Sequence, residues 1–313
     1  MPLAECELVI VGAGVAGCTA AMYGRRYGLN VIVLERAMPG GQAALAPMIE
    51  NYPGFPEGIN GMELTQRIHQ QAVNFGAEFI TAEAMGISRA DDGRWILHTD
   101  QGDMCGVAVI VATGAAPRKL GVPGEEEFRG RGVSYCATCD GFFFKGRTVA
   151  VIGGGNTAIE DAIYLADICE KVYVVHRRDE LRAEKYLQRR VFEKPNVEMV
   201  WDSVVVEIVG GDQVEKILVR NKKTNEHREI EVAGVFVAIG HEAKTDWLAD
   251  YVERDGSFII TNEKMETKAP GIFAAGDVRV TPIRQITTAV GDATIAAYYA
   301  YHYVDSFKSK EGH

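Results

Sequence analysis

The sequence has little of what metal-binding proteins usually carry. It contains six cysteines and seven histidines in 313 residues. Four of the cysteines, Cys6, Cys18, Cys105 and Cys169, stand singly, without the spacing of metal ligands. A structural zinc site takes two closely spaced Cys/His pairs, so we expect no metal.

Positive charge is also in deficit. Lys+Arg total 33 against 43 Asp+Glu, a formal net charge of −10, which argues against a nucleic-acid partner and against an anionic membrane surface. The apolar stretch at residues 8–22 follows Glu5 and Glu7, where a secretion signal would carry positive charge. With 47% hydrophobic and 24% charged residues, the composition is typical of a globular, non-membrane protein. We therefore expect a cytoplasmic location.

What the chain does contain is one supersecondary unit twice. In the first unit, an apolar strand runs into GAGVAG at residues 12–17, and a second strand ends at Glu35. In the second unit, an apolar strand runs into GGGNTA at residues 153–158, and a second strand ends at His176. The spacing from first glycine to last residue is 23 in both. A strand, glycine-rich turn, helix and strand in this order predict a dinucleotide site, because backbone N–H groups at a helix N-terminus must approach a pyrophosphate. The alternative is a glycine turn that only packs a helix on a sheet.

The residue after the second strand indicates which nucleotide binds. An acid there accepts hydrogen bonds from ribose hydroxyls, so Glu35 favours an unphosphorylated ribose, as in FAD. The second unit instead has Arg177 and Arg178 after His176, followed by Arg182. Arginine forks match a phosphate dianion, which favours NADPH over NADH. The alternative is a solvated basic face that continues through Lys185 and residues 189–190.

Strands that each stop at a glycine, at residues 109–114 and 235–240, are expected to be the last strands of two nucleotide domains. The second unit therefore lies in an insertion. The predicted class is α/β, with two Rossmann-like three-layer domains: residues 1–116 and 244–313 bind FAD, and residues 117–243 bind NADPH. The final residues, 308–313, are expected to fray.

The most informative short motif is CATCDG at residues 136–141, a CxxC only 14 residues before Gly153. Half a zinc site is the alternative for such a pair, but no second pair exists, so redox use is favoured. In a cytoplasmic protein a CxxC is more plausibly catalytic than structural. Asp140 is placed to exchange a proton with a thiolate, although Asp-Gly is also an ordinary turn pair. Gly276 and Asp277 end a further apolar strand, either as a ligand for a flavin ribityl hydroxyl or as a simple turn.

In chain order these motifs resemble the low-molecular-weight thioredoxin reductases. The matching segments are GGQ at residues 40–42, ENYPG at 50–54, ATGA at 112–115, CATCDG at 136–141, GGGNTA at 153–158, HRR at 176–178, and Gly276-Asp277 followed by Arg284-Gln285. The segment at residues 43–49 is more apolar than in many members. The resemblance implies a homodimer whose subunits each hold FAD, bind NADPH and pass electrons to the disulfide of thioredoxin.

The resemblance also implies the residues of each site. Those expected at FAD are Gly12, Gly14, Gly17, Glu35, Gly41, Gln42, Asn51, Thr113, Gly114, Gly276, Asp277, Arg284 and Gln285. Those expected at NADPH are Gly153, Gly155, Asn156, Thr157, His176, Arg177, Arg178 and Arg182. The expected catalytic residues are Cys136, Cys139 and Asp140, with Cys139 nearest the flavin and Cys136 attacking thioredoxin.

The dithiol and the NADPH site share one domain, and both need the flavin. We therefore expect the inserted domain to rotate about residues 113–117 and 240–243. Three alternatives stay open: a reductase of another disulfide carrier (glutaredoxin-like or peroxiredoxin-linked), an oxygen-dependent dithiol oxidase, and a redox-sensing binding protein without turnover. Because the first strand starts at Leu8, no peroxide-reducing domain is expected before it.

Overall fold

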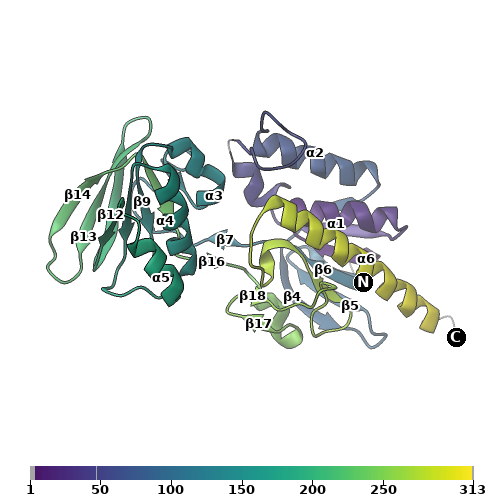
Figure 1. Cartoon of the computed structure of the whole chain (residues 1–313). Helices are drawn as coiled ribbons and strands as arrows, with labels where there is room; N and C mark the ends of the chain where they lie inside the picture. Colours follow the sequence, from purple (N-terminus) through teal and green to yellow (C-terminus); the bar gives the residue numbers. More distant parts are fainter. Residues whose placement is uncertain (1–3, 47, 312–313) are drawn as a thin grey trace. The chain divides into compact units, whose positions relative to one another are not determined.

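The chain divides into two compact units joined by two connections (Figure 1). The computed structural model describes residues 4–46 and 48–311; Pro47, in the apolar segment noted above, lies outside the described residues. Unit 1 is Met1–Ala116 with Glu242–His313, and unit 2 is Pro117–His241. The connections include two short strands that pair with each other, β7 (Ala116–Pro117) and β16 (His241–Glu242). The second boundary thus lies two residues before the expected residue 243.

Unit 1 is built on a seven-stranded sheet of order β3-β2-β1-β6-β5-β4, with β19 also paired to β6. The strands are β1 (Ala4–Val11), β2 (Val31–Glu35), β3 (Glu78–Thr81), β4 (Ala84–Arg89), β5 (Trp95–Thr99), β6 (Gly102–Val111) and β19 (Ile272–Ala274). The pairs that join β3, β2, β1, β6 and β19 are parallel, and those that join β4, β5 and β6 are antiparallel. The central parallel strands contain continuous apolar runs, at residues 8–11, 31–34, 107–111 and 272–274, as a sheet covered on both faces requires.

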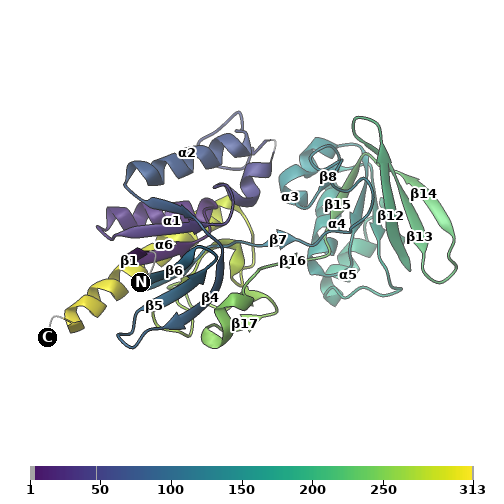
Figure 2. The same cartoon turned by 180° about the vertical axis from the view of Figure 1, so that it is seen from behind.

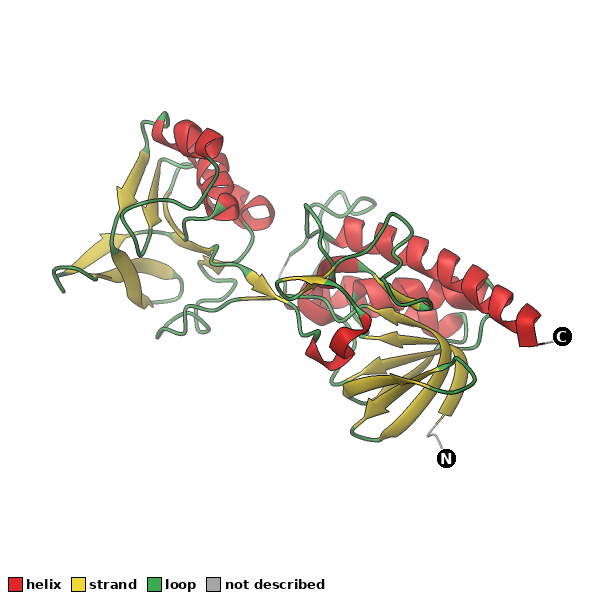
Figure 3. Cartoon of the chain, turned by 90° about the horizontal axis from the view of Figure 1, so that it is seen from below, coloured by secondary structure: helices red, strands yellow, loops and turns green. Residues whose placement is uncertain are grey.

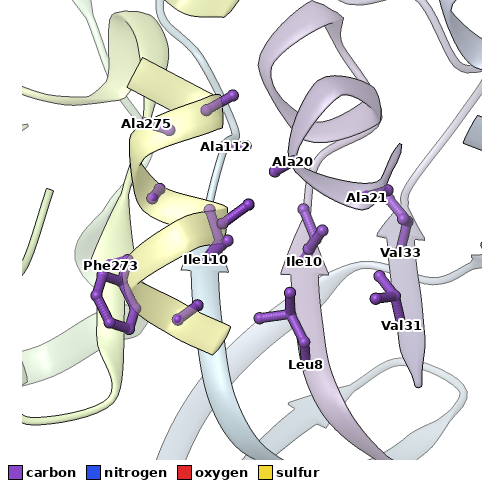
Figure 4. Packing of buried hydrophobic residues seen from close by; sticks show 14 of the residues in the cluster. Leu8, Ile10, Ala20, Ala21, Val31, Val33, Ile110, Ala112, Phe273 and Ala275 are labelled. Atoms are coloured by element: carbon purple, nitrogen blue, oxygen red, sulfur yellow. The ribbon is translucent and has the colours of Figure 1, made fainter. Parts of the chain in front are cut away.

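Helices cover one face of this sheet, and Figure 3 shows the long C-terminal helix lying along it. They are α1 (Val15–Arg26), α2 (Gly61–Asn74) and α6 (Ile286–Glu311). Figure 4 shows Ala20 and Ala21 of α1 next to Leu8, Ile10 and the β2 valines. Small alanine side chains let the helix approach the strands closely, so the turn from β1 to α1 is held by a well-packed core.

The C-terminal helix is longer than expected, because α6 continues to Glu311 where fraying was predicted from residue 308. Phe307 packs against the core of unit 1, and Lys308 forms an ion pair with Glu7. These two contacts hold the last turns of the helix, so the expectation of a frayed segment from Lys308 was wrong for residues 308–311.

The other face of the unit 1 sheet packs on a second apolar cluster. The remaining elements of this unit are η1 (Gly41–Leu45), η3 (Asp246–Tyr251), η4 (Gly276–Val278), β17 (Arg254–Asp255) and β18 (Phe258–Ile259). Leu248 of η3 and Ile259 of β18 are fully buried in that cluster.

Unit 2 has three layers around a five-stranded parallel sheet of order β11-β10-β9-β15-β8 (Figure 2). The parallel strands are β8 (Val133–Ser134), β9 (Thr148–Ile152), β10 (Lys171–Val175), β11 (Val197–Val200) and β15 (Gly234–Val237). One face packs on α3 (Ala137–Asp140), η2 (Gly141–Phe144), α4 (Asn156–Ile168) and α5 (Lys185–Phe192). The other packs on the antiparallel sheet of β12 (Ser203–Gly210), β13 (Val214–Asn221) and β14 (His227–Glu231).

Both units therefore confirm the predicted α/β class. In each, the parallel strands end at one edge of the sheet, and the glycine turns follow β1 and β9 at that edge. Ligands of open parallel sheets bind outside the carboxyl ends of the strands, where the strand order reverses.

Candidate active site

The first fingerprint uses its three glycines in two ways. Gly12 has φ +103°, and a Cβ there would lie 2.5 Å from the Ala112 carbonyl oxygen; a Cβ on Gly17 would lie 1.7 Å from the Gly12 carbonyl oxygen. These two glycines are needed for packing. Gly14 is different, because a Cβ there would meet only the Gly41 Cα at 3.9 Å. The lack of a side chain at Gly14 leaves space at the start of α1, and a helix N-terminus of this kind suits a pyrophosphate.

Glu35, at the end of β2, lies against the same turn. The Ala13 N–H donates to Glu35 Oε2 at 2.8 Å, and the Ala37 N–H donates to Oε1 at 3.0 Å. These bonds orient the carboxylate at the strand end. Each oxygen keeps a further lone pair for the ribose hydroxyls of an adenosine.

Residues far apart in sequence meet in unit 1. Thr113 and Gly114 follow β6, and Gly276 and Asp277 follow β19, which pairs with β6. η1, which begins at Gly41 and includes Gln42, is joined at its end to the start of α2, because the Gly61 N–H donates to the Ala46 carbonyl oxygen at 3.0 Å. The Asn51 side-chain amide donates to Gln285 Oε1 at 3.1 Å across 234 positions.

Two observations indicate that the residues at the carboxyl ends of the unit 1 strands fit FAD. Arg284 Nε is buried and has no hydrogen-bond partner within the described residues, although the guanidinium lies 4.3 Å from the Phe258 ring centre. Burial raises the pKa of Asp277 to about 6, against the opposing effect of Arg284. Buried polar groups are normally paired, so an unpaired donor and a desolvated carboxyl, in the same unit as the Gly14 turn, suit a polar ligand.

The second fingerprint repeats the first. A Cβ on Gly153 would lie 2.4 Å from the Ala238 carbonyl oxygen, just as a Cβ on Gly12 would lie 2.5 Å from the Ala112 carbonyl oxygen. A Cβ on Gly155, in contrast, would have no atom within 4 Å. Thr157 is exposed on the first turn of α4. Asn156 has its side chain tied to Glu184, accepting from its N–H at 2.9 Å and donating to Oε1 at 3.2 Å.

His176 lies below the turn that carries the arginines rather than on its surface. It is 4% exposed, a Cβ on Gly154 would lie 2.3 Å from its Nδ1, and its Nε2 is 3.1 Å from the Glu180 carbonyl oxygen. Burial lowers the pKa of this ring, and so do the neighbouring arginines. A neutral His176 therefore supports the turn, whereas Arg177 and Arg178 are exposed.

A surface pocket lies at this turn. It is lined by Arg177, Arg178, Asp179, Glu180, Leu181, Arg182 and Asp202. The three expected arginines thus share one pocket, with Arg182 on the loop before α5. Its N–H donates to the Gly154 carbonyl oxygen at 2.8 Å, which ties the arginine loop to the fingerprint.

Cys136 and Cys139 form a disulfide at the start of α3. Cys139 is exposed and Cys136 is half-buried. Burial raises the pKa of Asp140, and the Ser134 hydroxyl, which donates to Asp140 Oδ2 at 2.6 Å, lowers it. Ser134 Oγ also accepts from the Cys136 N–H at 3.0 Å. A raised carboxyl pKa suits a group that exchanges protons near neutral pH.

Sequence reasoning missed two groups that position these sites. Ser134 lies before the motif, and its role depends on the turn that brings it to Asp140. In unit 1, Asp292 Oδ2 accepts from the Gly276 N–H at 3.2 Å and from Arg279 Nη1 at 3.0 Å. The ion pair of Asp292 and Arg279 is mostly buried, and it fixes the turn next to Asp277. No spacing pattern marks either group.

The expected residues thus form two sets, one in each unit, with the dithiol in the set that carries the arginine pocket. Among the described residues, no group of three His, Cys, Asp or Glu side chains could hold a metal ion. None of the helices described has the length and apolar content needed to cross a membrane. Fold and site define a class: a disulfide oxidoreductase with two dinucleotide sites.

Comparison with known proteins specifies this class. The family model of pyridine nucleotide-disulphide oxidoreductases matches residues 6–293. The chain is similar to the thioredoxin reductase of Bacillus subtilis (strain 168), with 42% identity over 306 residues, 96% of each chain. It is also similar to that of Treponema pallidum (strain Nichols), with 41% identity over 97% of this chain and 99% of the relative.

A solved structure agrees. The crystal structure of thioredoxin reductase from Streptococcus pyogenes MGAS5005 has a TM-score of 0.91 and 44% identity, and the match covers 96% of this chain and 99% of that one. The chain belongs to the pyridine nucleotide-disulphide oxidoreductases and, within them, to the thioredoxin reductases.

Proposed function

We propose that this chain reduces the disulfide of thioredoxin with electrons from NADPH, through FAD and the Cys136–Cys139 pair. The observation that carries the proposal is the disulfide beside a desolvated Asp140, in the same unit as an arginine-lined pocket. A redox-sensing protein without turnover would make poor use of this combination. When bound, FAD supplies the two-electron redox group between the nicotinamide and the disulfide.

The protein's own residues then have distinct tasks. In the reduced form, the Cys136 thiolate attacks a sulfur of oxidised thioredoxin, which forms a mixed disulfide and releases one thioredoxin thiolate. The Cys139 thiolate attacks Cys136 Sγ, which re-forms the disulfide and releases the second thiolate. The two thioredoxin thiolates take up two protons, and we assign Asp140 the delivery of one of them.

The nucleotide sites bind by backbone and charge. In unit 1 the starts of α1 and η4, together with Glu35 and Asp277, would hold the pyrophosphate, ribose and ribityl groups of FAD. In unit 2 the bare Gly155 turn would receive the pyrophosphate of NADPH, and the arginine pocket would receive its 2′-phosphate. Because the dithiol and the NADPH site lie in one unit, we propose that unit 2 changes orientation during each cycle.

We also propose a cytoplasmic homodimer. Cys6, Cys18, Cys105 and Cys169 are buried free thiols, which suits a reducing compartment. The support for a dimer is the family resemblance, together with large apolar side chains exposed on α6 at Ile295 and Tyr298. Light scattering should give about twice the mass of one chain.

The first experiment follows the oxidation of NADPH and NADH by the FAD-loaded protein with oxidised thioredoxin, without oxygen. We expect turnover with NADPH, a much slower reaction with NADH, and a loss of at least about 10³-fold in Cys136→Ser, since the nucleophile is removed. Cys169→Ser is the matched control, a buried thiol in the same unit. Rapid flavin reduction without thioredoxin turnover would contradict the proposal and indicate another disulfide carrier.

A further inference from the structure

One lysine outside the arginine pocket holds two of its carboxylates. Lys223 Nζ lies 2.7 Å from Asp179 Oδ2 and 3.0 Å from Asp202 Oδ2. It stands in the turn between β13 and β14, 44 positions from Asp179 in sequence. Both carboxylates line the pocket, whereas Lys223 does not.

The charge of the pocket makes this contact important. The lining carries three guanidinium groups and three carboxylates, from Arg177, Arg178, Arg182, Asp179, Glu180 and Asp202. These charges cancel. A phosphate dianion gains from a positive surrounding and is repelled by neighbouring carboxylates. Lys223, which pairs with two of those carboxylates, therefore gives the charge around the arginines its positive sign.

The backbone fixes the lysine in this place. Asn221 Oδ1 accepts from the N–H groups of Lys223 at 2.8 Å and of Thr224 at 3.0 Å, which forms a side-chain turn. The Lys222 N–H donates to the Asp202 carbonyl oxygen at 2.6 Å, and the Asp202 N–H donates to the Arg178 carbonyl oxygen at 3.2 Å. The hairpin end, Asp202 and the arginine turn are thus linked by backbone hydrogen bonds.

The ion pair favours the charged forms of both Lys223 and Asp179. The hydrogen bond to Lys223 lowers the pKa of Asp179, and the two carboxylates raise the pKa of Lys223. The side chains of Lys223 and Asp179 are 60% and 64% exposed, and that of Asp202 is 17% exposed. Exposed ion pairs add little to stability, so this arrangement matters for the charge that a ligand meets rather than for the fold.

We propose that Lys223 is a positioning residue for the selectivity of NADPH over NADH. By pairing with Asp179 and Asp202 it offsets one of their two negative charges, so that the three guanidinium groups, the three carboxylates and Lys223 together carry one net positive charge for the 2′-phosphate. The inference rests on the proposed function, since it assigns this pocket to NADPH. It adds a residue from the antiparallel sheet that does not itself bind the phosphate.

The test is calorimetric binding of 2′,5′-ADP and 5′-AMP to the full-length, FAD-loaded protein. We expect Lys223→Met to weaken binding of 2′,5′-ADP by about threefold to tenfold at low ionic strength, as removal of one charge about 10 Å from a dianion predicts. Binding of 5′-AMP should not change. The difference should shrink in 0.5 M salt, where the Debye length is only a few ångströms.

Two further variants separate charge from structure. Lys216→Met is the matched control, because Lys216 pairs with Glu229 at 2.8 Å on the same sheet, at the other end of β13. The double variant Asp179→Asn, Lys223→Met should recover most of the lost affinity, since one carboxylate no longer needs a partner. Asp202→Asn can be added, because asparagine tolerates the φ of +51° at this position.

The outcomes are distinct. Equal affinity of wild type and Lys223→Met for 2′,5′-ADP at low ionic strength would overturn the role of Lys223 alone, as would an equal loss for 5′-AMP. If the wild-type protein does not prefer 2′,5′-ADP over 5′-AMP, the arginine pocket is not the NADPH site, and the proposed function loses its support together with the role of Lys223.

Discussion

Asp140 shows how two opposing effects act on one carboxyl group. Burial raises its pKa, and the hydrogen bond from Ser134 favours the ionised form and lowers it. Burial is the larger effect, so the group remains protonated to a higher pH than an exposed aspartate. A proton donor beside a dithiol needs this property, because only the protonated carboxyl can give a proton to the thiolate that leaves.

We predict opposite results for two substitutions at this pair. As proton donor, Asp140 loses its proton when the pH rises above its pKa, so thioredoxin turnover should decline on the alkaline side. Asp140→Asn should lower kcat by about 10²-fold and remove that decline. Ser134→Ala removes the bond that favours the ionised form, so the decline should move to higher pH. The measurement is kcat from pH 5 to 9 with each variant.

The fingerprint residues also differ individually in what they do. His176, expected among the NADPH residues, is buried and supports the turn, whereas its neighbours Arg177 and Arg178 face solvent. Asn156 is tied to Glu184. The sequence places all of them at the strand end, but burial and hydrogen bonding separate the residues that hold the turn from those that are free to meet a ligand.

At the scale of elements, the two βαβ units use their glycines in the same two ways, for close packing and for open space. Gly12 and Gly153 each face the carbonyl oxygen of an alanine that follows a neighbouring strand, whereas Gly14 and Gly155 face open space. Gly12 and Gly153 are needed because the turn before each helix passes close to the backbone at the end of the neighbouring strand, where a Cβ would clash. The second pair is needed only if a ligand approaches the backbone.

This difference predicts opposite phenotypes. Gly153→Ala places a Cβ against the Ala238 carbonyl oxygen and should lower the free energy of unfolding by about 2–4 kcal/mol. Gly155→Ala has no atom to meet, so stability should change by less than about 0.5 kcal/mol, while NADP⁺ binds at least about tenfold more weakly because the methyl group occupies the place of the pyrophosphate. Denaturant unfolding and calorimetry measure the two effects. Tight NADP⁺ binding by Gly155→Ala would place the cofactor elsewhere.

At the scale of the whole molecule, each unit has its own apolar cores. Unit 2 contains two buried clusters, one on each face of its parallel sheet. Its two ends are adjacent, because the Arg118 N–H donates to the Gly240 carbonyl oxygen at 2.9 Å. All the residues of the arginine pocket and the dithiol lie within it.

We therefore expect residues 117–241 to fold when expressed alone. The fragment should unfold cooperatively and bind 2′,5′-ADP within about threefold of the full chain, since it retains every lining residue. It should not retain FAD. As the complementary control, residues 1–116 and 242–313 joined by a short linker should keep FAD and lose 2′,5′-ADP binding. A fragment that is unfolded by circular dichroism would contradict the independence of unit 2.

The amino-acid sequence alone determined the fold class, the repeated nucleotide unit and the dithiol, because these depend on local patterns: apolar runs, glycine positions and a CxxC. It also placed Glu35 and the arginines at strand ends, which follows from a fixed spacing within one βαβ unit. Most of the expected FAD residues are likewise next to a strand end or in a short motif.

Only the tertiary structure decided which groups surround those motifs. Ser134 at Asp140, Asp292 at Gly276 and Lys223 at Asp179 are contacts between segments that no spacing rule links. The same holds for the last turns of α6, where Phe307 packs against the core of unit 1 and Lys308 pairs with Glu7 near the start of the chain, contacts that override the tendency of a terminus to fray. Local pattern determines which elements form, whereas burial and long-range charge, which set the pKa of a carboxyl or the sign of a pocket, exist only after the elements have packed.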